Sequence, residues 1–211
     1  MDFTRRKYLK LLLWLSASDY EFVTYEDYCT GKLPKRFVIL RHDVDLKPQK
    51  SLEIARYEHT IGAKAVYYFR AVPESWDATI IKTIHQWGHE VGYHYESLAT
   101  CDGDIQKAYD DFKMNLEHLR KFVPVSTICM HGSPYSPYDS KDIWKQFDFK
   151  DLGIIGEPYL STDFSKMLYL TDTGRRWDGY DVSVRDEIEG FQEEWIAKGW
   201  VFHSTDEIIK E

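Results

Sequence analysis

Residues 37–45 of the chain read Phe-Val-Ile-Leu-Arg-His-Asp-Val-Asp, a short apolar run that leads directly into charged side chains. The run at 37–40 is four residues long and contains β-branched side chains, which is typical of a buried β-strand. Pro48 then opens a helical pattern that continues to about Ile61 and ends at Gly62, in line with the residue preferences at helix ends. The stretch therefore predicts a strand followed by a helix.

The same alternation of short apolar runs and helical patterns continues along the chain. The clearest helix begins at Asp104, where apolar residues recur at steps of three and four, and another begins at Asp77. Strands that alternate with helices imply a mainly parallel sheet, so the predicted fold class is α/β, either a distorted, incomplete (β/α) barrel or an open doubly wound sheet. We expect further strands at 65–69, 89–94, 126–130 and 200–202, weaker strands at 153–155 and 167–170, and helices also at 140–147 and 187–197.

The length of 211 residues suits one domain or at most two small ones, and we predict a single domain over residues 1–211. Its N-terminus has basic residues before Leu11–Leu15 and small residues after them, an order that imitates a secretory signal. However, Lys10 interrupts the apolar stretch, and Leu9, Leu12 and Leu13 have helical spacing. An amphipathic helix at about 4–16 is therefore the favoured interpretation.

Charge and cysteine content limit the partners and the compartment. The chain has 27 basic and 35 acidic side chains, and a net charge of −8 repels phosphate backbones, so we expect no nucleic acid partner. No apolar run approaches the roughly 18–20 residues that a membrane span requires. Three widely spaced cysteines form neither a disulfide framework nor a zinc motif, which favours a reducing, cytoplasmic compartment.

Two aspartates follow the first predicted strand, at the end where active sites of parallel α/β folds collect. Asp43 and Asp45 alternate, so in an extended chain both carboxylates point the same way, roughly 6–7 Å apart. Such a pair can divide its tasks, with one carboxylate holding a cation and the other acting as a general base. The alternative interpretation is a structural pair that caps the chain or forms salt bridges with Arg41 or Lys47.

Histidines lie at three other predicted strand ends. His94 and Glu96 are two residues apart and can share a face of the third strand, whereas His89 is five residues from His94 and does not share that face unless the strand breaks. His131 and His203 follow the fourth and the last predicted strands, and an imidazole can titrate near neutrality. Each of these histidines also has a structural interpretation, as a core residue or a strand cap.

A polar segment rich in turn-forming residues follows the weak strand at 167–170. It reads Thr-Asp-Thr-Gly-Arg-Arg-Trp-Asp at 171–178 and is interpreted as either an exposed loop or a binding loop. If it binds substrate, its candidate residues are Asp172, Arg175 and Trp177.

Taken together, these motifs resemble the polysaccharide deacetylases of the NodB type. The resemblance runs from about Phe37 to His203, and its most specific piece is Gly-His-Glu-Val-Gly-Tyr-His at 88–94. Arg-His-Asp-Val-Asp at 41–45 matches a divergent branch of that superfamily, which includes proteins encoded with surface-polysaccharide genes. The resemblance implies a distorted (β/α) barrel, a divalent metal ion that is usually zinc, and removal of an N- or O-linked acetyl group from a carbohydrate.

The resemblance also implies roles for single residues. Asp43 matches the catalytic base, Asp45 the metal-binding aspartate and His94 the first metal histidine. His203 matches the late histidine that acts as a general acid. In the common family pattern the two aspartates are adjacent, whereas Val44 separates them here.

The chain departs from the family at the remaining metal ligand. The second metal histidine of the pattern falls four residues after the first, where this chain has Leu98. Two other hypotheses therefore remain, a metal-free hydrolase of C–N amide bonds with the same fold and a catalytically inert barrel that binds a glycan or a partner. The candidates for a third ligand, or for substrate binding, are His131, Glu96, His89 and His42.

Overall fold

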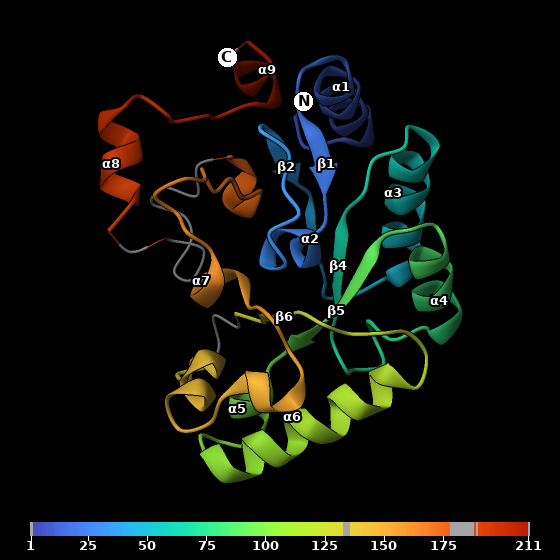
Figure 1. Ribbon diagram of the computed structural model, residues 1–211, viewed down its shortest axis with the longest axis vertical. Coiled ribbons are helices and arrows are strands. Elements are labelled where there is room, and N and C mark those ends of the chain that lie inside the picture. Colours follow the sequence, from blue (N-terminus) through green and yellow to red (C-terminus); the bar gives the residue numbers. More distant parts are fainter. Residues whose placement is uncertain (1, 133–135, 178–187, 189, 211) are drawn as a thin grey trace. The chain divides into compact units, whose positions relative to one another are not determined.

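The computed structural model in Figure 1 describes residues 2–132, 136–177, 188 and 190–210. These residues fall into two compact units. One is the segment Tyr20–Ser161, and the other combines the N-terminal helix with the described residues from Thr162 onward. The single domain expected over residues 1–211 stays a prediction.

Every strand of the described chain lies in the unit Tyr20–Ser161, and every strand pair is parallel. Two strands form a small sheet in the order β1-β2, and four form a larger sheet in the order β3-β4-β5-β6. The parallel sheet curls into a half-barrel, which confirms the α/β class and agrees with an incomplete barrel. The strands are β1 (Glu21–Val23), β2 (Phe37–Ile39), β3 (Arg41–Val44), β4 (Val66–Phe69), β5 (Glu90–Tyr95) and β6 (Ile128–Met130).

Three longer helices cover the outer face of the four-stranded sheet, namely α3 (Pro48–Thr60), α4 (Ala78–Gln86) and α6 (Ile105–Arg120) (Figure 1). Asp77 and Asp104 cap α4 and α6, as their positions in the sequence predict, because each carboxylate accepts a backbone N–H of the first turn. The same unit also contains α2 (Tyr25–Cys29), α5 (Ser97–Thr100), α7 (Pro158–Ser161) and 3₁₀ helices at Ser140–Lys145 and Phe149–Leu152.

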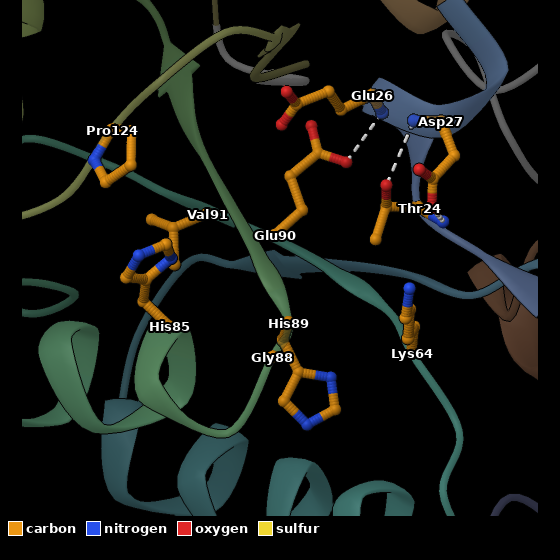
Figure 2. Close-up of a pocket in the computed structure, with 10 residues that line it drawn as sticks. All are labelled: Thr24, Glu26, Asp27, Lys64, His85, Gly88, His89, Glu90, Val91 and Pro124. Carbon is orange, nitrogen blue, oxygen red and sulfur yellow. Dashed lines mark hydrogen bonds between the residues drawn. The ribbon is translucent and has the colours of Figure 1, made fainter. Parts of the chain in front are cut away.

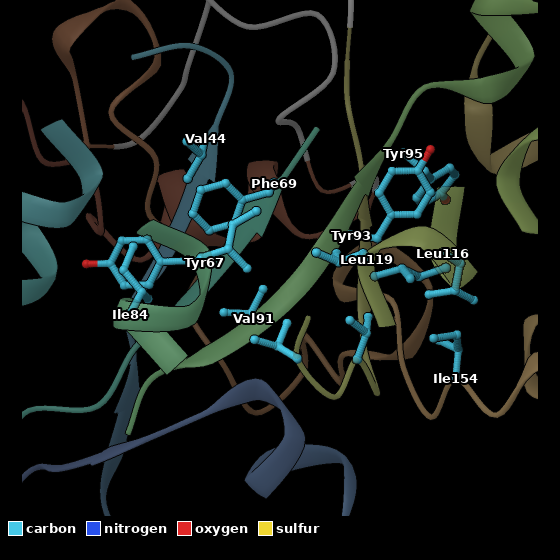
Figure 3. Close-up of a cluster of buried hydrophobic side chains, with 14 of the residues drawn as sticks. Val44, Tyr67, Phe69, Ile84, Val91, Tyr93, Tyr95, Leu116, Leu119 and Ile154 are labelled. Carbon is cyan, nitrogen blue, oxygen red and sulfur yellow. The ribbon is translucent and has the colours of Figure 1, made fainter. Parts of the chain in front are cut away.

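The main hydrophobic core lies between the sheet and these helices, and Figure 3 shows part of it. Residues in a strand point alternately to the two faces of a sheet. The outer face therefore takes every second residue of β4 and β5, among them Tyr67, Phe69, Val91, Tyr93 and Tyr95, which are all buried. The helices contribute Ile80, Ile81 and Ile84 from α4 and Phe112, Leu116 and Leu119 from α6.

The inner face takes the alternate residues, and the register aligns them across the strands. Asp43 pairs with Tyr68, Tyr68 pairs with Gly92, and His94 pairs with Cys129. Gly92 leaves the space that the Tyr68 ring occupies, since a Cβ atom at Gly92 would lie 2.3 Å from that ring. The Tyr68 ring thus packs on the inner face at Gly92, two residues before His94 on the same strand.

The second unit contains α1 (Arg5–Ala17), α8 (Gln192–Ala197), α9 (Thr205–Ile208) and a 3₁₀ turn at Thr173–Arg175. The helix expected at about 4–16 is observed as α1, which Thr4 caps by accepting the backbone N–H of Lys7. Lys7 and Lys10 of α1 both form ion pairs with Asp206 of α9. None of the described helices combines the length and apolar character that crossing a bilayer requires.

Several expectations differ from the structure. The segment 153–155 is not a strand, because Gly153 ends a 3₁₀ helix at φ +70° and only an isolated bridge joins Thr127 to Gly156. No strand is assigned at 167–170 or 200–202 in the described chain. The last predicted helix is observed only from Gln192, two residues after Gly190 at φ +81°, and its expected start at Glu187 lies outside the described residues. Within the predicted helix at 140–147, Ser140–Lys145 forms a 3₁₀ rather than an α-helix. The three-residue strand β1 was not predicted.

Candidate metal centre

Three side chains converge on the inner face of the four-stranded sheet, at the carboxyl ends of its strands. Asp45 follows β3, His94 lies near the end of β5, and His131 follows β6. Asp45 Oδ1 is 3.5 Å from His94 Nε2 and 3.5 Å from His131 Nε2. One ligand atom from each residue lies within 4.8 Å of the other two, which makes the three a possible metal-binding group.

The surroundings of both imidazoles favour this role for the Nε2 atoms. His94 Nδ1 lies 2.9 Å from the Cys129 carbonyl oxygen, which can only accept a hydrogen bond, so Nδ1 carries a proton and the neutral form of the ring has its lone pair on Nε2. The backbone N–H of His131 donates to the carbonyl of Tyr95 over 2.8 Å, which holds His131 beside the end of β5. Both rings therefore present one nitrogen towards Asp45.

Electrostatics keep Asp45 ionised. Burial alone would raise the pKa of Asp45, but contact with His94 and the nearby His131 and Arg70 lower it below its usual value. Burial likewise opposes protonation of His94, and the carboxylates of Asp43 and Asp45 outweigh it, so the pKa of His94 is raised. Within the described part of the chain, Asp45 Oδ1 is buried without a hydrogen bond although the side chain is 48% exposed. One carboxylate oxygen is thus turned inward, and the side chain remains open to solvent.

These donors fit a divalent metal ion. One carboxylate and two imidazoles form the O/N set of many catalytic zinc sites, in which three protein ligands leave a fourth position open. The buried, unbonded Asp45 Oδ1 is the kind of atom that a cation would satisfy. A second grouping of potential ligand atoms, Asp43, His94 and Cys129, shares the same histidine. Cys129 belongs to a buried apolar cluster, so we regard the Asp45 grouping as the better site.

Asp43 lies next to this centre on the same face of β3. Its Oδ2 atom is 3.9 Å from His94 Nε2 and 3.1 Å from Arg41 Nη2. The same Arg41 nitrogen donates to the Tyr159 hydroxyl over 2.9 Å. Val44, between the two aspartates, points to the other face and is buried in the main core. The intervening valine therefore keeps both carboxylates on the inner face.

Glu96 contacts His131 from the side of the ring that faces away from Asp45. Its Oε2 atom is 3.1 Å from His131 Nδ1, a close charge contact that does not have the alignment of a hydrogen bond. Arg70 donates two hydrogen bonds to the Glu96 carboxylate, from Nε to Oε1 and from Nη2 to Oε2, each over 2.9 Å. Burial would raise the pKa of Glu96, but His131 and Arg70 lower it. Glu96 belongs to neither group of potential metal ligands found among the described residues.

The structure places two other candidate ligands, His42 and His89, in a separate cluster. Both lie near the fully buried carboxylate of Glu58, with His42 Nε2 at 2.6 Å from Oε1 and His89 Nδ1 at 3.8 Å from Oε2. The Tyr67 hydroxyl also donates to Glu58 Oε2 over 2.5 Å. Strand alternation explains this separation, because His42 points to the face opposite to Asp43.

The remaining predicted residues lie in the other unit, where the loop at 171–177 is tied to the segment after residue 201. His203 Nε2 is 2.9 Å from Arg176 Nη2, and its backbone N–H donates to Glu207. The Trp177 indole donates to Thr205 Oγ1 over 3.1 Å. Asp172 and Arg175 belong to the adjoining 3₁₀ turn. The roles expected for these four residues stay predictions.

Sequence reasoning missed Arg70 and Tyr159. A signal for Arg70 was present, since it is a charged residue directly after the buried strand β4, in the same kind of position as Asp45 and His131. Tyr159 had no such signal, because it lies in the short helix α7, far from Arg41 in the sequence. Only the tertiary structure brings the two side chains together.

A pocket of about 270 Å³ lies near the start of β5, at the end of the sheet opposite to the metal candidates (Figure 2). Its lining includes Lys64, His89 and Glu90. Burial raises the pKa of Glu90 to about 7, although Glu90 accepts hydrogen bonds from the Glu26 N–H and the Thr127 hydroxyl. These bonds give Glu90 a structural role between β5 and α2.

No model of a protein family matches this chain, and no curated protein matches it.

Proposed function

We propose that the protein is a metal-dependent hydrolase that removes an N- or O-linked acetyl group from a carbohydrate, in surface-polysaccharide metabolism. The observation that carries the proposal is the convergence of Asp45, His94 and His131 at the carboxyl end of a parallel half-barrel. The resemblance of residues 41–45 and 88–94 to NodB-type polysaccharide deacetylases supports the substrate class. The family assignment itself is part of this proposal.

In this proposal Asp45, His94 and His131 hold a zinc ion. His131 then supplies the ligand that the family pattern would place at residue 98. Leu98 cannot do so, since a leucine side chain has no ligand atom, and it is buried in an apolar cluster with Ala108 and Ile143. When bound, a zinc ion polarises an acyl oxygen and lowers the pKa of a water molecule.

Asp43 is the proposed general base. It lies beside His94, and its contact with Arg41 fixes the orientation of the carboxylate. A base in this position accepts the proton of the attacking water, a task that typically contributes about 10²–10⁴-fold to the rate. The resemblance assigns to His203 the protonation of the leaving amine or alcohol, and Asp172, Arg175 and Trp177 are the proposed contacts to the sugar.

The test combines metal analysis with acetate release from a panel of acetylated glycans. The parent protein should bind one zinc ion and release acetate, and His94→Ala and His131→Ala should each lose both properties. His118→Ala is the matched control, because His118 lies on the outer helix α6, where its ring packs at a tilt against Trp76. Zinc-bound parent that releases no acetate would favour an inert glycan-binding barrel. Hydrolysis of amides by metal-free parent would favour the metal-free hydrolase.

A further inference from the structure

We infer that Glu96 is a positioning residue that holds His131 for metal binding, and that Arg70 holds Glu96 in turn. The inference rests on the proposed metal centre and assigns Glu96 a place behind the ligand rather than on the ion. Three observations carry it, namely the side of the ring that Glu96 contacts, the bonds that occupy its oxygens, and the order of the strands.

The negative charge of Glu96 at this distance favours one tautomer of His131. A neutral imidazole carries its proton on one nitrogen only, and an ionised carboxylate can only accept a hydrogen bond. Glu96 Oε2 at 3.1 Å from Nδ1 therefore favours the proton on Nδ1 and leaves the Nε2 lone pair facing Asp45. For His94 the Cys129 carbonyl does the same, over 2.9 Å. The two imidazoles thus share one arrangement. The Nδ1 atom of His94 faces a main-chain carbonyl, and the Nδ1 atom of His131 faces a side-chain carboxylate.

The bonds of Glu96 explain why it is not a ligand itself. Arg70 binds both carboxylate oxygens in a bidentate contact, which fixes the plane of the carboxylate. His131 also lies at Oε2, so the oxygens are engaged on the side of the ring away from Asp45. The side chain is only 18% exposed, which limits its freedom to swing round the ring.

The strand order places Arg70 between the parts that it joins. Arg70 follows β4, which lies between β3 and β5 in the sheet, and Asp45 and Glu96 follow those two neighbours. Arg70 Nη1 donates to the Asp45 carbonyl over 3.2 Å while the rest of the guanidinium holds Glu96. A single side chain therefore connects the main chain at one proposed ligand to the carboxylate behind another.

The test measures zinc affinity by calorimetric titration, and coordination by the visible absorption of Co²⁺. We expect Glu96→Gln to weaken zinc binding roughly 10–100-fold, because removing a carboxylate behind a metal-bound histidine typically has that effect. The Co²⁺ spectrum at saturation should stay unchanged, since the ligands are the same. Arg70→Lys keeps the charge but loses the bidentate contact, and it should weaken binding less than Glu96→Gln does.

The matched control is Glu58→Gln, a buried carboxylate that also contacts histidines but on the outer face of the sheet. It should lower thermal stability without changing zinc affinity. A merely structural role of Glu96 would give the same result as this control. NMR of the metal-free protein adds an independent measurement, with His131 expected as the Nδ1–H tautomer in the parent and shifted towards the Nε2–H tautomer in Glu96→Gln.

The outcomes separate this inference from the proposed function. Parent protein that binds zinc but releases no acetate would refute the deacetylase and leave the positioning role intact. Equal zinc affinity of parent and Glu96→Gln would overturn the positioning role alone, and so would a changed Co²⁺ spectrum at saturation, which would make Glu96 a ligand. Parent protein that binds no divalent ion would overturn both.

Discussion

Replacing Gly92 by alanine should destabilise the fold through a single steric overlap. The added Cβ atom would lie 2.3 Å from Cδ1 and Cε1 of Tyr68 and 2.8 Å from the Thr127 carbonyl oxygen. Carbon atoms in ordinary contact are about 3.5–4.0 Å apart, so the ring would have to move by roughly 1 Å or more. Tyr68 is fully buried and its hydroxyl is 3.1 Å from Thr127 Oγ1, which leaves the ring little room to move.

The size of the effect follows from two opposing contributions. Overpacking a core typically costs about 1–3 kcal/mol, and the backbone oxygen at Thr127 cannot rotate away, so we expect the upper end. Alanine also restricts the unfolded chain, which offsets about 0.4–1 kcal/mol. The net loss should be about 2 kcal/mol, which in a chain of this length corresponds to a fall in Tm of about 4–8 °C.

The assay is urea denaturation of four proteins, namely the parent, Gly92→Ala, Tyr68→Ala and the double variant. Tyr68→Ala alone should cost about 3–5 kcal/mol, because it removes a buried ring. Removing the ring also removes most of the overlap, so the double variant should be more stable than the sum of the two single losses predicts, by about 1 kcal/mol or more. A Gly92→Ala protein within 0.5 kcal/mol of the parent, or strictly additive losses, would refute the reasoning.

Three further predictions concern the site and the buried acids. Asp43→Asn should retain zinc and lose acetate release by about 10²–10⁴-fold, whereas Asp45→Asn should lose zinc and activity together; metal analysis and acetate assays check this, and the reverse pattern would exchange the two roles. Leu98→His should lower the free energy of unfolding without raising zinc affinity, because residue 98 is buried in an apolar cluster; a gain in affinity by titration would contradict the proposed ligand set. The free energy of unfolding of the parent should fall as the pH rises from about 4.5 to about 7, because folded Glu90, with its pKa raised to about 7, holds a proton that the unfolded side chain releases near pH 4.5. Burial also raises the pKa of Glu157 to about 7, so Glu157 adds to the same dependence. Glu90→Gln should therefore reduce the slope in denaturation measured across this range, and an unchanged slope would show that Glu90 does not contribute to it.

The sequence was sufficient for the parts of the fold that depend on local patterns. The segments predicted as strands near 37–40, 65–69, 89–94 and 126–130 all contain observed strands. The runs at 37–40 and 65–69 are rich in β-branched and aromatic residues, which favour strands. The capping carboxylate of Asp104 correctly marks the start of a helix for a similar reason, since it bonds within its own turn. Asp45, His94 and His131 were all candidates because each lies at or just past a strand end.

The rest depends on which strands become neighbours. The run at 37–45 reads as one strand and its end, yet β2 pairs with β1 while β3 pairs with β4, a division that no local pattern encodes. The contact of Arg70 with Glu96 likewise requires β4 to lie beside β5. Strand parity could have separated His42 from Asp43, because adjacent residues of a strand face opposite ways. Sequence alone did not reveal that Glu58 lies on the outer face, where its carboxylate pairs with His42.

The alternation along β5 has a consequence for how this chain tolerates change. Val91, Tyr93 and Tyr95 face the buried core, whereas Gly92 and His94 face the inner side, and Glu96 follows them after the strand ends. Substitutions at the first set, and at Gly92, should deplete the amount of folded protein in a cell, whereas those at His94 and Glu96 should reduce zinc binding more than the amount of folded protein. A survey of all substitutions at residues 91–96 that measures protein abundance and zinc binding separately would then distinguish the two kinds of position along β5 and directly after it.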